Sequence, residues 1–220
     1  MSLFRLDASI RTEGSVSREV ADTVVRSWAE THPDAAIVHR EIGTTPLPST
    51  AWPNAVTAGW VDPSQRTAEQ HNAVALATQL ADELFDADAY VVATPLYNYG
   101  IQSNLKTWID LLITDPRLAT GGDQPLAGRP LVLVVARGGG YQPGTPKEGW
   151  DHATPYLQRI FGDVWGMDVH LVEAELTLAD VVPAMEALRD KADEIRANAH
   201  TVAGDHGRTV AAKVGASAAA

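Results

Sequence analysis

Residues Pro130-Leu131-Val132-Leu133-Val134-Val135-Ala136 are apolar at every position. This pattern is typical of a strand in a parallel sheet that helices cover on both faces. Four further β-like runs occur along the chain, at Leu3–Asp7, Ala36–Val38, Ala89–Thr94 and Val169–Val172. The sequence therefore predicts five strands.

Segments with apolar residues at helical spacing separate these runs. The expected helices follow Ser17 and cover approximately Pro63–Phe85, Leu105–Leu112, Thr154–Trp165 and Leu178–His200. Strands that alternate with helices predict an α/β fold, a doubly wound five-stranded parallel sheet of order 2-1-3-4-5 in three layers, α/β/α.

The chain shows no internal repeat or linker, so one domain is expected over residues 1–204. The Ala- and Gly-rich end, residues 205–220, is expected to be a flexible tail. Gly43–Asp62 contains three prolines and two tryptophans, and we expect it to form a long loop.

The composition is that of an ordinary globular protein of 220 residues, 45% hydrophobic and 20% charged. A formal net charge of −11 argues against nucleic acid or an anionic membrane surface as a partner. The absence of cysteine excludes disulfides and thiolate chemistry and favours a reducing, cytoplasmic location. No secretory signal, membrane span or metal-binding motif is expected from the sequence, and His71 and His152 are expected to be solvated or helix-capping.

Unusual loops follow the first, third and fourth predicted strands. In open α/β sheets, ligands bind beyond the carboxyl ends of the strands, where the strand order reverses. In the predicted order this point lies between the first and third strands. We therefore expect the Ser9–Ser17 loop, the Pro95–Gly100 turn and the Arg137–Gly140 run to converge on one crevice.

The first of these loops is rich in hydroxyl groups. Ser9, Ser15 and Ser17 precede a helix, whose N-terminal amides and dipole favour an anion, and Arg11 adds a positive charge. The same serines also suit plain helix capping. The chain has neither a G-x-G-x-x-G after the first strand nor a P-loop, so a mononucleotide is favoured over a dinucleotide.

The other two loops suit a flat polar ligand. The turn around Asn98 can offer backbone groups to the edge of a ring system, although its residues also suit a simple tight turn. The glycines after Arg137 let the backbone approach a ligand closely, and the amides of Arg137 and Gly138 could stabilise negative charge on it. Trp52, Trp60 and Tyr141 are candidates for an apolar ceiling over a substrate, with ordinary packing as the alternative.

Together these motifs resemble the FMN-dependent NADH azoreductases, which are flavodoxin-like NAD(P)H:quinone reductases. The resemblance rests on Ser9…Ser15-Val16-Ser17, on Pro95-Leu96-Tyr97-Asn98-Tyr99-Gly100-Ile101 with Leu105, Lys106, Trp108 and Asp110, and on Ala136-Arg137-Gly138-Gly139. It continues through Asp151–Tyr156 and Asp168–Glu173 to about His200.

The resemblance implies an enzyme that binds FMN and passes electrons from NADH or NADPH to quinones in a ping-pong cycle, with azo compounds as further acceptors. It also implies a homodimer with active sites at the interface. The implied phosphate contacts are Ser9, Arg11, Ser15, Val16 and Ser17. The implied ring and ribityl contacts are Pro95, Leu96, Tyr97, Asn98, Tyr99, Ala136, Arg137, Gly138 and Gly139.

Two departures from the family pattern concern the walls of this site. Ala136 stands where the family usually has serine or threonine, and residues 115–123 lack the aromatic side chain found in the family's loop. The second departure leaves the acceptor open. Alternatives to a quinone reductase are a flavin-dependent oxidoreductase acting on one biosynthetic intermediate and a flavodoxin-type electron carrier without its own substrate.

Overall fold

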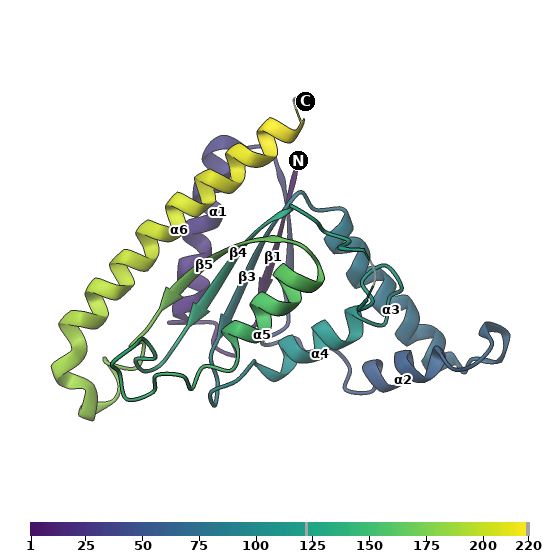
Figure 1. Ribbon diagram of the computed structural model, residues 1–220, viewed down its shortest axis with the longest axis horizontal. Coiled ribbons are helices and arrows are strands. Elements are labelled where there is room, and N and C mark those ends of the chain that lie inside the picture. Colours follow the sequence, from purple (N-terminus) through teal and green to yellow (C-terminus); the bar gives the residue numbers. More distant parts are fainter. Residues whose placement is uncertain (122, 219–220) are drawn as a thin grey trace.

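The computed structural model describes residues 1–121 and 123–218, and the side chains up to residue 216. Its centre is one parallel sheet of order β2-β1-β3-β4-β5, which confirms the predicted fold (Figure 1). The strands are β1 (Ser2–Asp7), β2 (Ala36–Glu41), β3 (Ala89–Pro95), β4 (Pro130–Ala136) and β5 (Asp168–Ala174). Every residue of β3 and β4 is buried, as the continuous apolar run at 130–136 predicts.

Helices cover both faces of the sheet (Figure 1). On one face, α1 (Val16–Thr31) and α6 (Arg189–Ala218) pack together over Leu3 and Val91. On the other, α3 (Ala68–Phe85), α4 (Ser103–Leu112) and α5 (Thr154–Gln158) pack over Phe4 and Val92. Neighbouring residues of one strand thus feed opposite cores, because successive side chains of a strand point to opposite faces.

The segment Gly43–Asp62 is not the structureless loop that its composition predicts. Residues Ala51–Ala58 form helix α2, which packs on α3 through the buried Ala51 and Ala55. Pro53 lies in the first turn of this helix, where a backbone N–H has no intrahelical partner to lose. The proline therefore marks the start of a helix here.

The C-terminal segment also differs from expectation. After a short 3₁₀ helix, η3 (Pro183–Leu188), helix α6 runs from Arg189 to Ala218, through most of the predicted tail. Val210, Ala211 and Val214 are buried against α1. A Cβ on Gly207 would lie 2.7 Å from the carbonyl oxygen of Val24, so small residues here let the two helices approach closely. Residues 219–220 of the predicted tail lie outside the described residues.

Two predicted helices have different boundaries in the structure. The Pro63–Phe85 segment divides into a 3₁₀ turn, η1 (Pro63–Gln65), and α3, whose start is set by a capping box between Thr67 and Gln70. The Thr154–Trp165 segment is α5 followed by a π-helical stretch, η2 (Arg159–Val164). Within the described part of the chain, no helix has the length and apolarity to span a membrane.

Candidate functional site

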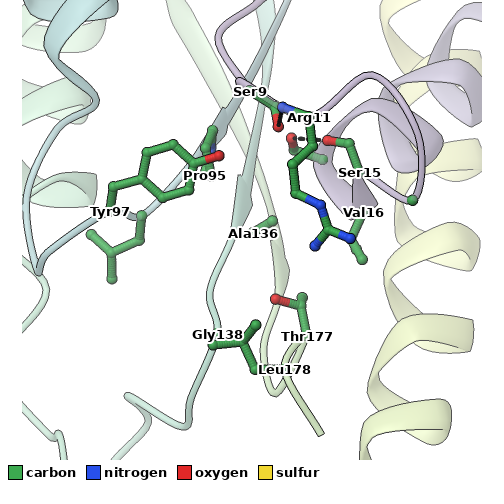
Figure 2. Close-up of a pocket in the computed structure, with 13 residues that line it drawn as sticks. Ser9, Arg11, Ser15, Val16, Pro95, Tyr97, Ala136, Gly138, Thr177 and Leu178 are labelled. Carbon is green, nitrogen blue, oxygen red and sulfur yellow. Dashed lines mark hydrogen bonds between the residues drawn. The ribbon is translucent and has the colours of Figure 1, made fainter. Parts of the chain in front are cut away.

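The carboxyl ends of β1, β3 and β4 are neighbours in the sheet, and their loops meet around a cavity of about 120 Å³ (Figure 2). Tyr97 lies on one side of it and Arg11 on the other (Figure 2). The structure brings together these residues that the sequence singles out: Ser9, Arg11, Ser15, Val16, Ser17, Pro95, Leu96, Tyr97, Ala136 and Gly138.

The N-terminus of α1 is an array of donors at this cavity. Ser9, Ser15 and Ser17 are buried, and the hydroxyl oxygens of Ser15 and Ser17 lie 3.3 Å apart. Ser15 is the N-cap, yet its side chain makes no capping bond. Within the described residues, the amides of Val16, Ser17 and Arg18 have no hydrogen-bond partner, since the first intrahelical bond runs from Glu19 to Ser15. Such an array, at the positive end of a helix, suits a phosphate.

Arg18 fixes the backbone of the loop from behind. Its guanidinium donates to the carbonyl oxygens of Ser9 at 2.7 Å and Arg11 at 2.9 Å, and pairs with Glu41 at 2.6 Å. Burial alone raises the pKa of the Glu41 carboxyl, but bonds from Arg18 and from the amides of Thr44 and Gly43 hold that pKa below its usual range. Glu41 thus remains a carboxylate that orients Arg18.

A buried carboxylate, Asp7, lies under the same loop. Its oxygens bond Arg5 at 2.9 Å and His39 at 2.8 Å, and Arg18 lies 3.4 Å away. Ligand atoms of Asp7, His39 and Glu41 lie within 4.8 Å of one another, a spacing that could hold a metal ion. The two arginines already compensate both carboxylates, so this cluster serves as an anchor for the loop.

The backbone of Gly43 lies closer to the Ser9–Ser17 loop than a residue with a side chain could. A Cβ at this position would lie 2.0 Å from the carbonyl oxygen of Ser9, far inside van der Waals contact. The amide of Gly43 donates to the backbone carbonyl of Asp7 and to the side-chain carboxylate of Glu41. The lack of a side chain at residue 43 therefore allows the backbone of Ser9 to lie in its observed position.

The Tyr97–Gly100 turn has two central residues in the left-handed region, Asn98 with φ 49° and Tyr99 with φ 66°. Among the described residues, the amides of Asn98 and Tyr99 find no partner and remain available to a ligand. The amide of Leu96 donates to the carbonyl of Ala136 at 2.8 Å, so Leu96 can offer a ligand only its side chain and carbonyl.

Arg137 does not take the position that the sequence predicts. Its amide donates to the carbonyl of Ala174 at 2.8 Å and is unavailable to a ligand. Its buried side chain ion-pairs with Asp151 at 2.6 Å, Glu173 at 2.5 Å and Glu175 at 3.1 Å. Although burial favours the neutral form, these carboxylates raise the pKa of the guanidinium. Arg137 therefore acts as a buried anchor for the loops behind the site.

Sequence reasoning missed the segment after β5. Thr177 and Leu178 line the first cavity (Figure 2). They directly follow Leu176, which has a left-handed backbone conformation with φ 58°. The amide of Leu178 bonds the carbonyl of Gly138, and a Cβ on Gly138 would lie 2.6 Å from the Leu178 side chain. The available signal was the position of this segment at the end of a parallel strand.

A second cavity of about 600 Å³ adjoins the first and shares four lining residues with it, Leu96, Tyr97, Gly138 and Leu178. Its other walls include the predicted residues Asn98, Tyr99, Gly139 and Tyr141, and three that the sequence did not reveal, Lys147, Val182 and Met185. A volume of this size suits a ligand of several rings.

Trp52 and Trp60 line neither cavity, so the structure does not bear out their predicted place in the ceiling of the site. Both belong to the α2 region, which protrudes from the body of the protein (Figure 1). Their side chains are 46% and 77% exposed.

Three other predicted features lie away from the cavities. In the described part of loop 115–123, Arg117 pairs with Asp82 at 2.7 Å and lies over the ring of Phe85, so this part packs on α3. His71 and His152 are exposed, as the sequence predicts for solvated histidines.

The parallel sheet of order 2-1-3-4-5, with a donor-rich helix N-terminus at its switch point, defines a flavodoxin-like protein. The family model described as the flavodoxin-like fold matches residues 1–199.

Curated relatives narrow this class. An FMN-dependent NADH:quinone oxidoreductase of Parafrankia sp. (strain EAN1pec) is 40% identical over 205 residues, which cover 92% of this chain and 97% of that protein. One from Frankia casuarinae is 38% identical, over 91% and 96% of the two chains. The crystal structure of an azoreductase from Bacillus anthracis, 25% identical, superposes with a TM-score of 0.75 over 95% of this chain and all of that one. The protein belongs to the flavodoxin-like family of these FMN-dependent NADH:quinone oxidoreductases.

Proposed function

We propose that the protein is an FMN-dependent oxidoreductase that passes electrons from NADH or NADPH to quinones, with azo compounds as further acceptors. The observation that carries this proposal is the position of a helix N-terminus with unpartnered amides and buried serines beside two adjoining cavities. Bound FMN supplies the redox chemistry, because it accepts two electrons from the nicotinamide and gives them to the acceptor.

The residues present fit FMN. The unpartnered amides of the first turn of α1, with Ser15 and Ser17, would hold its phosphate, and Arg11 would add charge to the contact. The amides of Asn98 and Tyr99 would bond the edge of the ring. At residue 136 the usual family hydroxyl is missing, which leaves fewer side-chain donors for the ring.

Negative charge on a bound ring would be stabilised by one amide fewer than the sequence predicts, because the amide of Arg137 donates to the carbonyl of Ala174. The amide of Gly138 has no partner among the described residues and would take this role alone. The side chains of Leu96 and Leu178 would exclude water from the reacting face, because they border both cavities.

The second cavity favours an enzyme over an electron carrier. The ring edge at Asn98 and Tyr99 would occupy one part of this cavity of about 600 Å³, and a carrier, which exchanges electrons with another protein, has no use for the remainder. An enzyme that binds donor and acceptor in turn needs one site next to the cofactor, and the part of the cavity lined by Tyr141, Val182 and Met185 would provide it. The proposed ping-pong cycle uses the same site for both.

The protein purified with FMN is expected to oxidise NADH or NADPH when a neutral naphthoquinone is present. Double-reciprocal plots at several quinone concentrations should be parallel, since donor and acceptor alternate in one site. The measurement is the decrease in NAD(P)H absorbance, together with a visible spectrum for flavin. A protein that takes up FMN but transfers no electrons from NAD(P)H would be a carrier, and one that takes up no FMN would refute the proposal.

We also propose a homodimer with the active sites at its interface. The support is the protruding α2 region, which exposes Trp52, Trp60 and Val61, since large exposed apolar side chains are typical of interfaces. The absence of cysteine supports a reducing compartment, the cytoplasm, as its location.

Replacing Trp60 with glutamate is expected to weaken the dimer, because a buried interface tryptophan typically contributes about 2 kcal/mol or more, roughly thirtyfold in Kd. Sedimentation velocity over a concentration series measures this change. Gln65→Glu, which adds the same charge on a nearby exposed residue but keeps the indole, is the control. If the wild type is a monomer, or if both variants associate equally well, Trp60 is not part of an interface.

A further inference from the structure

One cation lies at the second cavity, and the proposed function assigns it no role. The Nζ of Lys147 lies 5.6 Å from the centre of the Tyr99 ring and 5.5 Å from that of Tyr141. Its side chain runs along the backbone of Gly139, where a Cβ would come within 3.2 Å of the Nζ and 3.6 Å of the Cδ. The backbone of Gly139 and the rings of Tyr99 and Tyr141 therefore form the surface on which this side chain packs.

The rings and the cation suit each other electrostatically. Burial raises the pKa of the Tyr141 phenol, and Tyr99 and Asp151 raise it further, so the ring is neutral at physiological pH. Tyr99 in turn packs edge-on against Trp150 at 5.4 Å, and its carbonyl accepts from the amide of His152. Lys147 is thus held by cation–π contacts on a supported aromatic surface.

No carboxylate in the described part of the chain lies within ion-pairing distance of Lys147. The nearest acidic side chains along this loop have other partners: Asp151 pairs with Arg137, and Glu148 accepts from the amide of Gly144 at 2.7 Å. In a protein with a net charge of −11, a positive charge that lines a cavity without a carboxylate partner among the described residues is a distinct feature.

Apart from Lys147 and Asn98, the side chains that line this cavity are apolar or aromatic. Leu96, Leu178, Val182 and Met185 line it together with the tyrosine rings. A planar aromatic molecule can bury its rings against these side chains, and one negatively charged substituent would reach Lys147. A neutral molecule of the same shape would gain the apolar contacts alone.

We propose that Lys147 selects electron acceptors that carry an anionic group, a sulfonate or a carboxylate, on a planar aromatic ring system. This inference rests on the proposed function, whose chemistry it leaves unchanged: a hydride from NADH and one proton from solvent convert the quinone to the hydroquinone. Lys147 contributes to binding through charge and takes no part in the transfer of electrons or protons.

The test compares 1,4-naphthoquinone-2-sulfonate with neutral 1,4-naphthoquinone as acceptors for the FMN-loaded protein. Lys147→Met keeps the length of the side chain and removes the charge. We expect it to raise KM for the sulfonate roughly three- to fivefold, the upper range for a partly exposed ion pair, and to change KM for the neutral quinone less than twofold. Lys147→Arg should retain the preference, and added salt should reduce it in the wild type.

Lys213→Met is the matched control, because it makes the same change in net charge. Lys213 bonds Asp168 at the opposite end of the sheet from the cavities, so its loss should leave both KM values unchanged. A second measurement does not depend on turnover. Isothermal titration calorimetry gives the affinity for naphthalene-2-sulfonate and for neutral 2-naphthol, neither of which the flavin reduces. Only the affinity for the sulfonate should fall in Lys147→Met.

Three outcomes would overturn the inference. Equal losses for charged and neutral ligands would mean that Lys147 acts by packing; a change confined to the KM of NADH would mean that it binds the donor; unchanged constants would mean that it binds neither. If the wild type does not reduce the neutral quinone at all, the proposed function fails, and the calorimetric titrations still decide whether Lys147 recognises an aromatic anion.

Discussion

The Gly43→Ala variant is expected to unfold about 2–3 kcal/mol more easily than the wild type and to lose most of its affinity for FMN. The added methyl group would overlap the carbonyl oxygen of Ser9, which is backbone and cannot rotate away. The loop must therefore shift relative to the sheet, and the donors on Ser15 and Ser17 shift with it. Urea unfolding of the FMN-free protein and fluorescence titration with FMN measure the two effects separately.

Gly162→Ala is the control for this variant. The nearest atom to a Cβ at residue 162 is 3.8 Å away, an ordinary contact, so this substitution should leave FMN affinity unchanged. If Gly43→Ala matches the wild type in both stability and FMN affinity, the close approach of residue 43 to the loop has no energetic importance.

Replacing Ser15 and Ser17 together with alanine is expected to raise the Kd for FMN about 100-fold or more. Each hydroxyl would donate to a charged phosphate, a bond that contributes roughly 1.5–3 kcal/mol, and 1.4 kcal/mol corresponds to a factor of ten. The side chain of Ser15 makes no capping bond, so its loss should cost α1 little stability. Equilibrium dialysis or fluorescence quenching measures the Kd.

Riboflavin has the ring and the ribityl chain of FMN but no phosphate, so its binding distinguishes contacts to the ring and ribityl chain from contacts to the phosphate. The double variant should bind riboflavin as tightly as the wild type does, whereas its affinity for FMN falls toward that for riboflavin. Ser103→Ala, at an exposed serine of α4, should change neither value. Equal affinity of the double variant and the wild type for FMN would remove the phosphate from this loop.

The parts of the fold that could be predicted are those written in short-range patterns. Continuous apolar runs such as 130–136 occur where a strand is covered on both faces, and alternation with helices then restricts the strand order. The location of the first cavity could be predicted from this strand order, because the Ser9–Ser17 loop and the Pro95–Gly100 turn both follow the carboxyl ends of strands. Tyr97 and Ser15 could therefore be placed together without coordinates.

The features that could not be predicted depend on contacts between distant segments. Whether the amide of Arg137 is free depends on Ala174, and whether Trp60 lies at the site depends on how α2 packs. Lys147 has no local motif, and only the folded loop brings it between two rings. The segment around Pro53 was wrongly predicted to be a loop, because a proline is compatible with a helix only in its first turn and the sequence does not show where α2 begins.

Helix α1, whose N-terminus carries the proposed phosphate donors, is covered by α6, a segment that is synthesised much later than α1 itself. Val24 and Trp28 are buried beside Val210 and Val214 of α6, and Gly207 contacts the carbonyl of Val24. During synthesis, the apolar face of α1 must stay uncovered until residues 189–218 have emerged. The helix that offers the proposed donors is therefore covered only after α6 has been made, and we expect stable FMN binding to follow the synthesis of α6.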